Sequence, residues 1–153
     1  MKYIKLFEEH SYSVYELITM SPYKVIDLLM SEIQKGYPDL KLIQDILEYS
    51  VVDINSKDSI GQTALMLAAY RGNEKCVELL LNHPGIDVNL QDKWGWTALM
   101  FAAYRRNEKS IELLLSHPGI DITLEETESN RTAWDIAFPY IREKFPQLNP
   151  NFR

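Results

Sequence analysis

The sequence predicts an all-α solenoid in which helix-turn-helix units stack side by side and project β-hairpin turns. A 29-residue segment, 61–89, recurs at 95–123 with 21 identical positions, at an offset of 34 residues. Within each copy, two short apolar patterns of helical spacing are separated by polar residues. One such unit cannot bury all its apolar side chains, whereas stacking about three or more units gives a continuous core.

The composition is that of a folded protein. Of 153 residues, 46% are hydrophobic and 25% are charged, which favours a globular chain over a disordered one. The formal net charge is −6 and no basic block is present, so we expect no binding to nucleic acid or to a membrane surface. Cys76 is the only cysteine, which excludes an intramolecular disulfide and fits a reducing compartment.

The N-terminal segment carries no clear targeting signal. Residues 1–20 place charges inside their only apolar stretch, which makes a poor signal peptide, and no stretch of the chain is long enough to span a bilayer. We therefore expect a cytoplasmic protein. The nucleus, or the host-cell cytosol in the case of a viral or bacterial effector, stays open as an alternative.

Each unit begins with a helix whose two ends are marked. Thr63 and Thr97 have hydroxyl groups that can accept hydrogen bonds from the free N–H groups of a first helical turn. Gly72 ends the helix, and Arg106 stands at this position in the next unit. If the break needs a positive φ, a non-glycine residue costs about 1 kcal/mol there. Arg106→Gly is then expected to stabilise the fold or to leave its stability unchanged. Between the two ends lie small residues that allow close packing, namely Ala64, Leu65, Ala68 and Ala69 and their equivalents 34 residues later.

A second helix and a turn complete each unit. Val77, Leu80 and Leu81 have the i, i+3, i+4 spacing of an apolar helix face. The sequence HPGID then ends this helix with a proline and a glycine. Residues 92–95 place Asp first and Gly fourth, as a type I β-turn prefers, and residues 58–61 do the same.

These motifs resemble the ankyrin repeat. The pattern D-x-x-G-x-T-A-L-x-x-A-A-x-x-G, followed by V-x-L-L-L and G-I-D-V-N, extends over residues 58–125. Met66 and Met100 stand where the family usually has His, and the second helix is followed by one extra residue. The resemblance implies an ankyrin-repeat solenoid whose partners bind the turn tips and the exposed face of the first helices.

We interpret the chain as a single domain, 1–153. Residues 58–91 and 92–125 are the two clear repeats. Residues 22–57 form a degenerate repeat, in which Asp53-Ile54-Asn55 matches Asp87-Val88-Asn89. Residues 1–21 are expected to form an N-terminal helical lead-in, and residues 126–153 a C-terminal capping repeat and tail.

Motifs for catalysis or cofactor binding are missing from the sequence. It contains no Gly-rich phosphate loop, paired-cysteine zinc motif or G-x-S-x-G elbow. His83 and His117 recur because the repeat does, and Cys76 aligns with Ser110 in a second helix. The acidic segment 125–128 is interpreted as a solvated loop. We therefore expect no enzyme activity, cofactor, metal ion or small-molecule substrate.

Aromatic and basic side chains gather at positions that packing leaves free. Trp, Tyr and Arg dominate the energetics of protein interfaces. Since stacked units lie about 10 Å apart, Tyr70 and Tyr104 are expected to form one ladder, and Arg71 and Arg105 a second. The predicted binding residues are Ile60, Gln62, Tyr70, Arg71, Lys93, Trp94, Trp96, Tyr104, Arg105 and Arg106.

Two tryptophans in one turn need an explanation. Trp94 and Trp96 are two residues apart in an extended arm, so their rings are expected to share one side. We predict that a partner covers them. The alternative is packing within the chain, with Trp96 against Tyr104.

The sequence therefore predicts a non-catalytic, monomeric module that binds another protein, as a competitor or a small adaptor. A structural or assembly protein that self-associates through the same aromatic face is the alternative. The resemblance also implies that Asn55 and Asn89 are sites for an asparaginyl hydroxylase. The alternative is that both side chains only brace the hairpins through hydrogen bonds.

Overall fold

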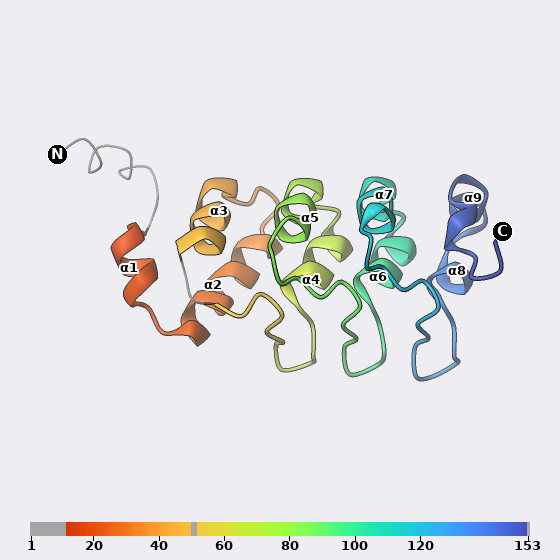
Figure 1. The fold of residues 1–153 in the computed structure, drawn as a ribbon, viewed down its shortest axis with the longest axis horizontal. Helices are drawn as coiled ribbons and strands as arrows, with labels where there is room; N and C mark the ends of the chain where they lie inside the picture. The colour runs from red at the N-terminus through yellow and green to blue at the C-terminus, as the bar shows by residue number, and fades with distance from the viewer. Residues whose placement is uncertain (1–11, 50–51, 153) are drawn as a thin grey trace.

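The computed structural model describes residues 12–49 and 52–152, and the regular elements in these ranges are all helices. Figure 1 shows them as an extended array from one end of the chain to the other. The elements are α1 (Val14–Thr19), α2 (Pro22–Gln34), α3 (Leu40–Tyr49), α4 (Ala64–Arg71), α5 (Glu74–Leu81), α6 (Ala98–Arg105), α7 (Glu108–Ser116), α8 (Ala133–Ile136), α9 (Pro139–Lys144) and the 3₁₀ helix η2 (Pro146–Leu148).

The helices lie in two rows. Helices α2, α4, α6 and α8 form one row, and α3, α5, α7 and α9 form the other (Figure 1). Contacts run along each row, since α4 contacts α2 and α6, and α5 contacts α3 and α7. The loops after α3, α5 and α7 all project to the same side (Figure 1). The predicted all-α solenoid is confirmed. Among the described residues, no helix combines the length and the apolar character needed to cross a membrane.

The first helix of each repeat starts where the sequence predicts. The Thr63 hydroxyl accepts a hydrogen bond from Met66 N at 3.3 Å, and Thr63 N donates to Met66 Sδ at 3.4 Å. Thr97 and Met100 repeat both contacts, at 3.2 and 3.4 Å. Both methionines are buried, so one side chain caps the helix and also fills the core. The reciprocal arrangement satisfies two N–H groups that the helix itself leaves free.

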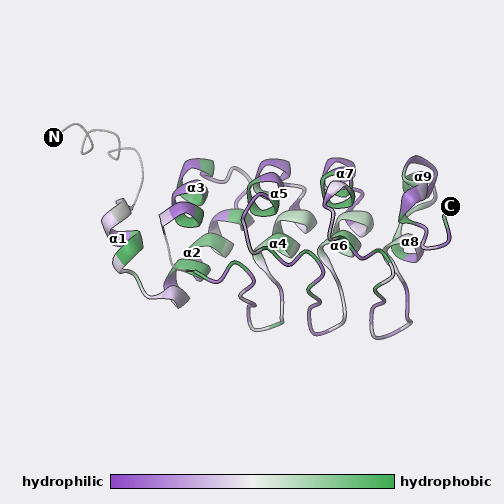
Figure 2. Cartoon of the chain, viewed as in Figure 1, coloured by the Kyte–Doolittle hydropathy of each residue, from purple (hydrophilic) through white to green (hydrophobic). Residues whose placement is uncertain are grey.

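The core lies between the two rows and along the first. Figure 2 shows hydrophobic segments on the inner sides of the helices and hydrophilic ones on the outer side of the second row. The alanines of α4 and α6 are buried, so these helices approach closely over most of their length. The second row contributes its predicted apolar face, with Val77 and Leu80 in α5 and Ile111 and Leu114 in α7.

The turn between the two helices of a unit has the expected left-handed residue. Gly72 has φ 71° and Arg106 has φ 62°. The asparagine after Arg106 connects its unit to the preceding unit. Asn107 Nδ2 donates to the carbonyl oxygens of Ala69 at 2.7 Å and of Tyr70 at 3.1 Å. An asparagine thus donates to carbonyl groups at the end of the preceding first helix.

Neighbouring loops bind each other through the backbone. Gly95 N donates to Asp92 O at 3.1 Å, which closes the predicted turn. Lys93 N donates to Ile60 O at 3.2 Å, and Thr127 N donates to Trp94 O at 2.9 Å. Such bonds need close contact between loops. A Cβ atom on Gly95 would lie 2.9 Å from Thr127 N, and its φ is +79°.

The acidic segment 125–128 is the predicted solvated loop only in part, because Glu125 and Glu128 are exposed but Glu126 is not. Glu126 is buried, and its carboxylate accepts hydrogen bonds from Glu128 N at 2.8 Å and Ser129 N at 3.0 Å, and from Arg131 Nε at 3.1 Å. Burial opposes ionisation, but these donors outweigh it and lower the pKa of the Glu126 carboxyl. Glu126 stands where the two earlier turns have an aspartate. Its longer side chain suits this longer loop, in which Asn130 has the positive φ, 55°.

The ends of the array are covered by short helices. Helix α1 contacts α3, and Leu17 is buried. Residues 1–11 of the predicted lead-in lie outside the described residues. At the other end, the Arg106 guanidinium lies 3.6 Å from the centre of the Phe138 ring. Lys144 forms an ion pair with Glu108. Both contacts tie the last short helices to the repeat before them.

Gly95→Ala is expected to destabilise the protein by about 2 kcal/mol or more. The new methyl group would meet the backbone of the next loop, and the positive φ adds to the cost. Gly36→Ala is the control, because a Cβ on Gly36 has no atom within 4 Å. Urea unfolding of both variants measures the difference. Equal stability of the two would show that the loops can separate without cost.

Arg106→Gly is expected to change stability by less than about 1 kcal/mol, because relief of the positive φ is offset by the lost contact with Phe138. In a Phe138→Ala background that offset is gone. The same substitution should then be more favourable by about 0.5–1 kcal/mol. Thermal or urea unfolding of the four proteins of this cycle measures the coupling. An identical effect in both backgrounds would contradict the stacking contribution.

Candidate protein-binding surface

An apolar groove lies between the loop that starts at Asp92 and the helices α4 and α6. Its volume is about 330 Å³. We call it the aromatic groove, and its lining residues are Gln62, Tyr70, Asp92, Trp94, Trp96, Phe101 and Tyr104. Gln62, Tyr70, Trp94, Trp96 and Tyr104 belong to the predicted binding residues, so the fold brings half of that set together.

The rings of the aromatic groove pack on one another around Phe101. The ring centre of Trp96 lies 5.1 Å from that of Phe101 and 5.6 Å from that of Tyr104. Tyr70 meets Phe101 edge-on, at 5.9 Å. Such pairs stabilise beyond the area that they bury. Trp96 is partly buried by these contacts, so the expected packing of Trp96 against Tyr104 is present.

Trp94 has a different environment. This residue is 52% exposed, and Tyr104 is 49% exposed. The turn uses only the backbone of Trp94, whose N–H donates to Asp92 Oδ1 at 2.9 Å and whose carbonyl accepts from Thr127 N. The indole ring therefore stands at the edge of the groove without a role in closing the turn.

The predicted basic residues have different surroundings. The Arg105 guanidinium lies 4.6 Å from the centre of the Tyr70 ring, at the wall of the aromatic groove. Arg106 points instead to the C-terminal end, against Phe138. Arg71 and Lys93 are exposed to solvent. Ile60 is also exposed, and its carbonyl oxygen accepts the hydrogen bond from Lys93 N.

Two lining residues were not among the predicted binding residues. Phe101 stands where the preceding repeat has Leu67, and this difference between the copies was the available signal. Asp92 was interpreted only as a turn residue. Its Oδ1 does hold the turn, but its position in the groove depends on the contact between two loops and carries no local sequence signal.

Asn55 and Asn89 both bridge neighbouring units. Asn55 Nδ2 donates to Gly85 O at 2.8 Å, and its Oδ1 accepts from Asp87 N at 2.9 Å. Asn89 repeats the arrangement with Gly119 O at 2.7 Å and Asp121 N at 2.8 Å. Both side chains therefore brace neighbouring loops through hydrogen bonds, which is the alternative given above. Hydroxylation of the two asparagines stays a prediction.

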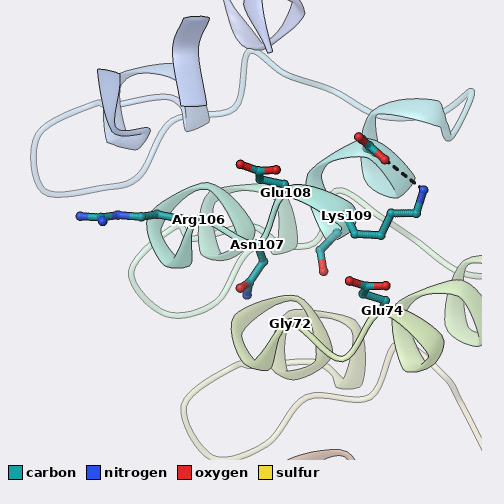
Figure 3. A pocket seen from close by; sticks show the side chains of 8 residues that line it. Gly72, Glu74, Arg106, Asn107, Glu108 and Lys109 are labelled. Carbon is teal, nitrogen blue, oxygen red and sulfur yellow. Dashed lines mark hydrogen bonds and ion pairs between the residues drawn. The ribbon is translucent and has the colours of Figure 1, made fainter. Parts of the chain in front are cut away.

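A second, polar hollow of about 460 Å³ lies where α5 and α7 begin (Figure 3). Figure 3 shows Asn107 directed toward Gly72 and Arg106 directed away from the hollow. Lys109 is paired with Glu112 at 3.0 Å. Asn107 in this hollow thus joins adjacent repeats, whereas the pair of Lys109 and Glu112 lies within α7.

The other residues that could carry reactive chemistry, Cys76 and His117, have the surroundings of structural residues. Burial raises the pKa of the Cys76 thiol to about 11, and nearby Glu32 adds to this effect. The thiol is therefore protonated at neutral pH and a weak nucleophile. His117 Nδ1 accepts a hydrogen bond from Gly119 N at 3.2 Å. Within the described ranges, no three His, Cys, Asp or Glu side chains are grouped so as to hold a metal ion.

The comparison with protein families agrees with this architecture. A family model described as ankyrin repeats, in three copies, matches residues 29–126, which is more than half of the chain. A search of curated proteins finds no match to the chain. The match begins within α2 and ends within the loop between α7 and α8. The chain therefore belongs to the ankyrin-repeat family, whose members are generally non-catalytic modules that bind other proteins.

Proposed function

We propose that this protein binds a partner protein through the aromatic groove and the loop tips beside it. It acts without catalysis, by occupying the partner's surface as a competitor or an adaptor. One observation carries the proposal: Trp94 is 52% exposed on a turn that uses only its backbone. The protein is proposed to act in the cytoplasm, because its single cysteine requires no disulfide-forming compartment.

The energetics of interfaces support this proposal. A partner that covers the groove would bury the exposed parts of Trp94 and Tyr104, and such rings contribute most of the binding energy at protein interfaces. The packed Trp96 and Phe101 rings beneath are already ordered. Binding would therefore cost little side-chain entropy at the centre of the interface.

Trp94→Ala is expected to lower the free energy of unfolding by less than about 1 kcal/mol, as exposed substitutions do. The same change should weaken binding to a partner captured with the wild-type protein by about 2 kcal/mol or more. Tyr37→Ala is the matched control, because Tyr37 is 98% exposed and lies outside the groove. Thermal unfolding and binding titrations of the two variants provide the measurements.

The outcomes separate the alternatives. A loss of several kcal/mol in folding stability for Trp94→Ala would show that the ring belongs to the core. Equal binding by Trp94→Ala and Tyr37→Ala would place the interface elsewhere. Light scattering of the chain alone over a concentration series tests self-association, because only that alternative predicts a mass that grows with concentration.

A further inference from the structure

The carboxylate of Asp92 has one oxygen in use and one without a partner. Oδ1 accepts hydrogen bonds from Trp94 N and Trp96 N, both at 2.9 Å. Oδ2 is buried, and no group in the described part of the chain donates to it. The side chain as a whole is only 8% exposed. Because a buried charged oxygen without a donor is unfavourable, Asp92 offers a strong acceptor to any donor that reaches it.

Asp92 is one of the residues that line the aromatic groove. Beside it in the lining are the indoles of Trp94 and Trp96 and the ring of Tyr104. Faces of aromatic rings attract cations, and indole does so most strongly. A carboxylate adds a full negative charge and a hydrogen-bond acceptor. The combination favours a positively charged group over a neutral one.

Two features favour a guanidinium group among cations. The first is that a guanidinium packs on a ring of this wall, since Arg105 lies 4.6 Å from the centre of the Tyr70 ring, although its charge opposes a second cation. A guanidinium is planar, so it can stack on an indole and donate N–H groups sideways to a carboxylate, which an ammonium cannot do. The net charge of −6 also attracts basic segments of a partner.

The preceding repeat shows what the site requires. Asp58 Oδ1 holds its own turn in the same way, through Ile60 N at 2.9 Å and Gln62 N at 2.8 Å. Ile60 and Gln62 stand where the next unit has the two tryptophans, so this turn lacks the indoles. The aspartate is thus common to both turns, while the ring pair belongs to the second.

We propose that the aromatic groove receives an arginine side chain of the partner protein, stacked on the indoles and hydrogen-bonded to Asp92 Oδ2. The inference rests on the proposed function and adds the chemistry of the partner. In this arrangement the bound guanidinium supplies the donor that the free protein lacks.

Titration of the ¹⁵N-labelled protein with N-acetyl-L-arginine amide tests this inference, with N-acetyl-L-citrulline amide as the neutral probe of nearly the same shape. The indole N–H signals of Trp94 and Trp96 are followed by NMR. We expect the arginine amide to bind about tenfold more tightly than the citrulline amide. Equal binding of the two, or no response of either indole signal to the arginine amide, would overturn the assignment.

Asp92→Asn tests the carboxylate. The asparagine keeps an oxygen for the two N–H groups of the turn and replaces Oδ2 by a donor. Binding of the arginine amide should fall about tenfold, whereas Asp58→Asn, the matched change in the preceding turn, should bind as the wild type does. A folded Asp92→Asn variant with wild-type binding would overturn the inference. Should this variant fail to fold, the arginine and citrulline titrations of the wild type decide.

These results are distinguishable from a failure of the proposed function. If the arginine amide fails to bind while a captured partner still depends on Trp94, the arginine is rejected and the groove stands as the interface. If partner binding is indifferent to Trp94→Ala, the proposed function fails, whatever the amide titration shows.

Discussion

The close approach of successive loops is the constraint on which the rest of the structure depends. Thr127 N reaches Trp94 O at 2.9 Å only because Gly95, one residue further on, has no side chain. Gly61 has the same role one unit earlier, where a Cβ would lie 2.9 Å from Lys93 N. The buried alanines of α4 and α6 allow the same closeness between helices. Backbone groups and small residues therefore set the stacking, so large side chains at the loop tips are not needed to hold it.

This division of roles explains how one scaffold can carry a specific surface. Both repeats use the same aspartate, glycine and threonine to build a loop and start a helix. The second repeat differs by placing Trp94, Trp96 and Phe101 where the first has Ile60, Gln62 and Leu67. These three exchanges, together with Tyr70 and Tyr104, line the aromatic groove without altering the hydrogen bonds of the turn. Binding properties can thus vary while the fold stays the same.

Hydrogen bonds within and between the units give most of the prominent polar residues a structural role. Asn107 holds the end of α4, Asn55 and Asn89 join successive loops, and Glu126 closes the third turn from a buried position. Buried polar groups are satisfied by partners in this way in most proteins. Asp92 Oδ2, His83 Nδ1 and Ser110 Oγ depart from that rule among the described residues, and of these three residues Asp92 lines the aromatic groove. The aspartate with this unsatisfied oxygen therefore belongs to the same surface that the exposed Trp94 indicates.

The sequence by itself determined the architecture, because its signals act over short distances in the chain. The Thr63 cap and the positive φ at Arg106 depend on residues a few positions apart, and the repeat itself is found by comparing the chain with itself. Only the tertiary structure decided which side chains are exposed to solvent and which are packed. Trp94 and Trp96 are equivalent in a linear pattern, yet Trp96 packs on Phe101 and Trp94 is exposed. Likewise, Arg106 faces Phe138, 32 positions along the chain, because the cap folds back on the last repeat. Such contacts depend on how the units stack, and no local pattern encodes that geometry.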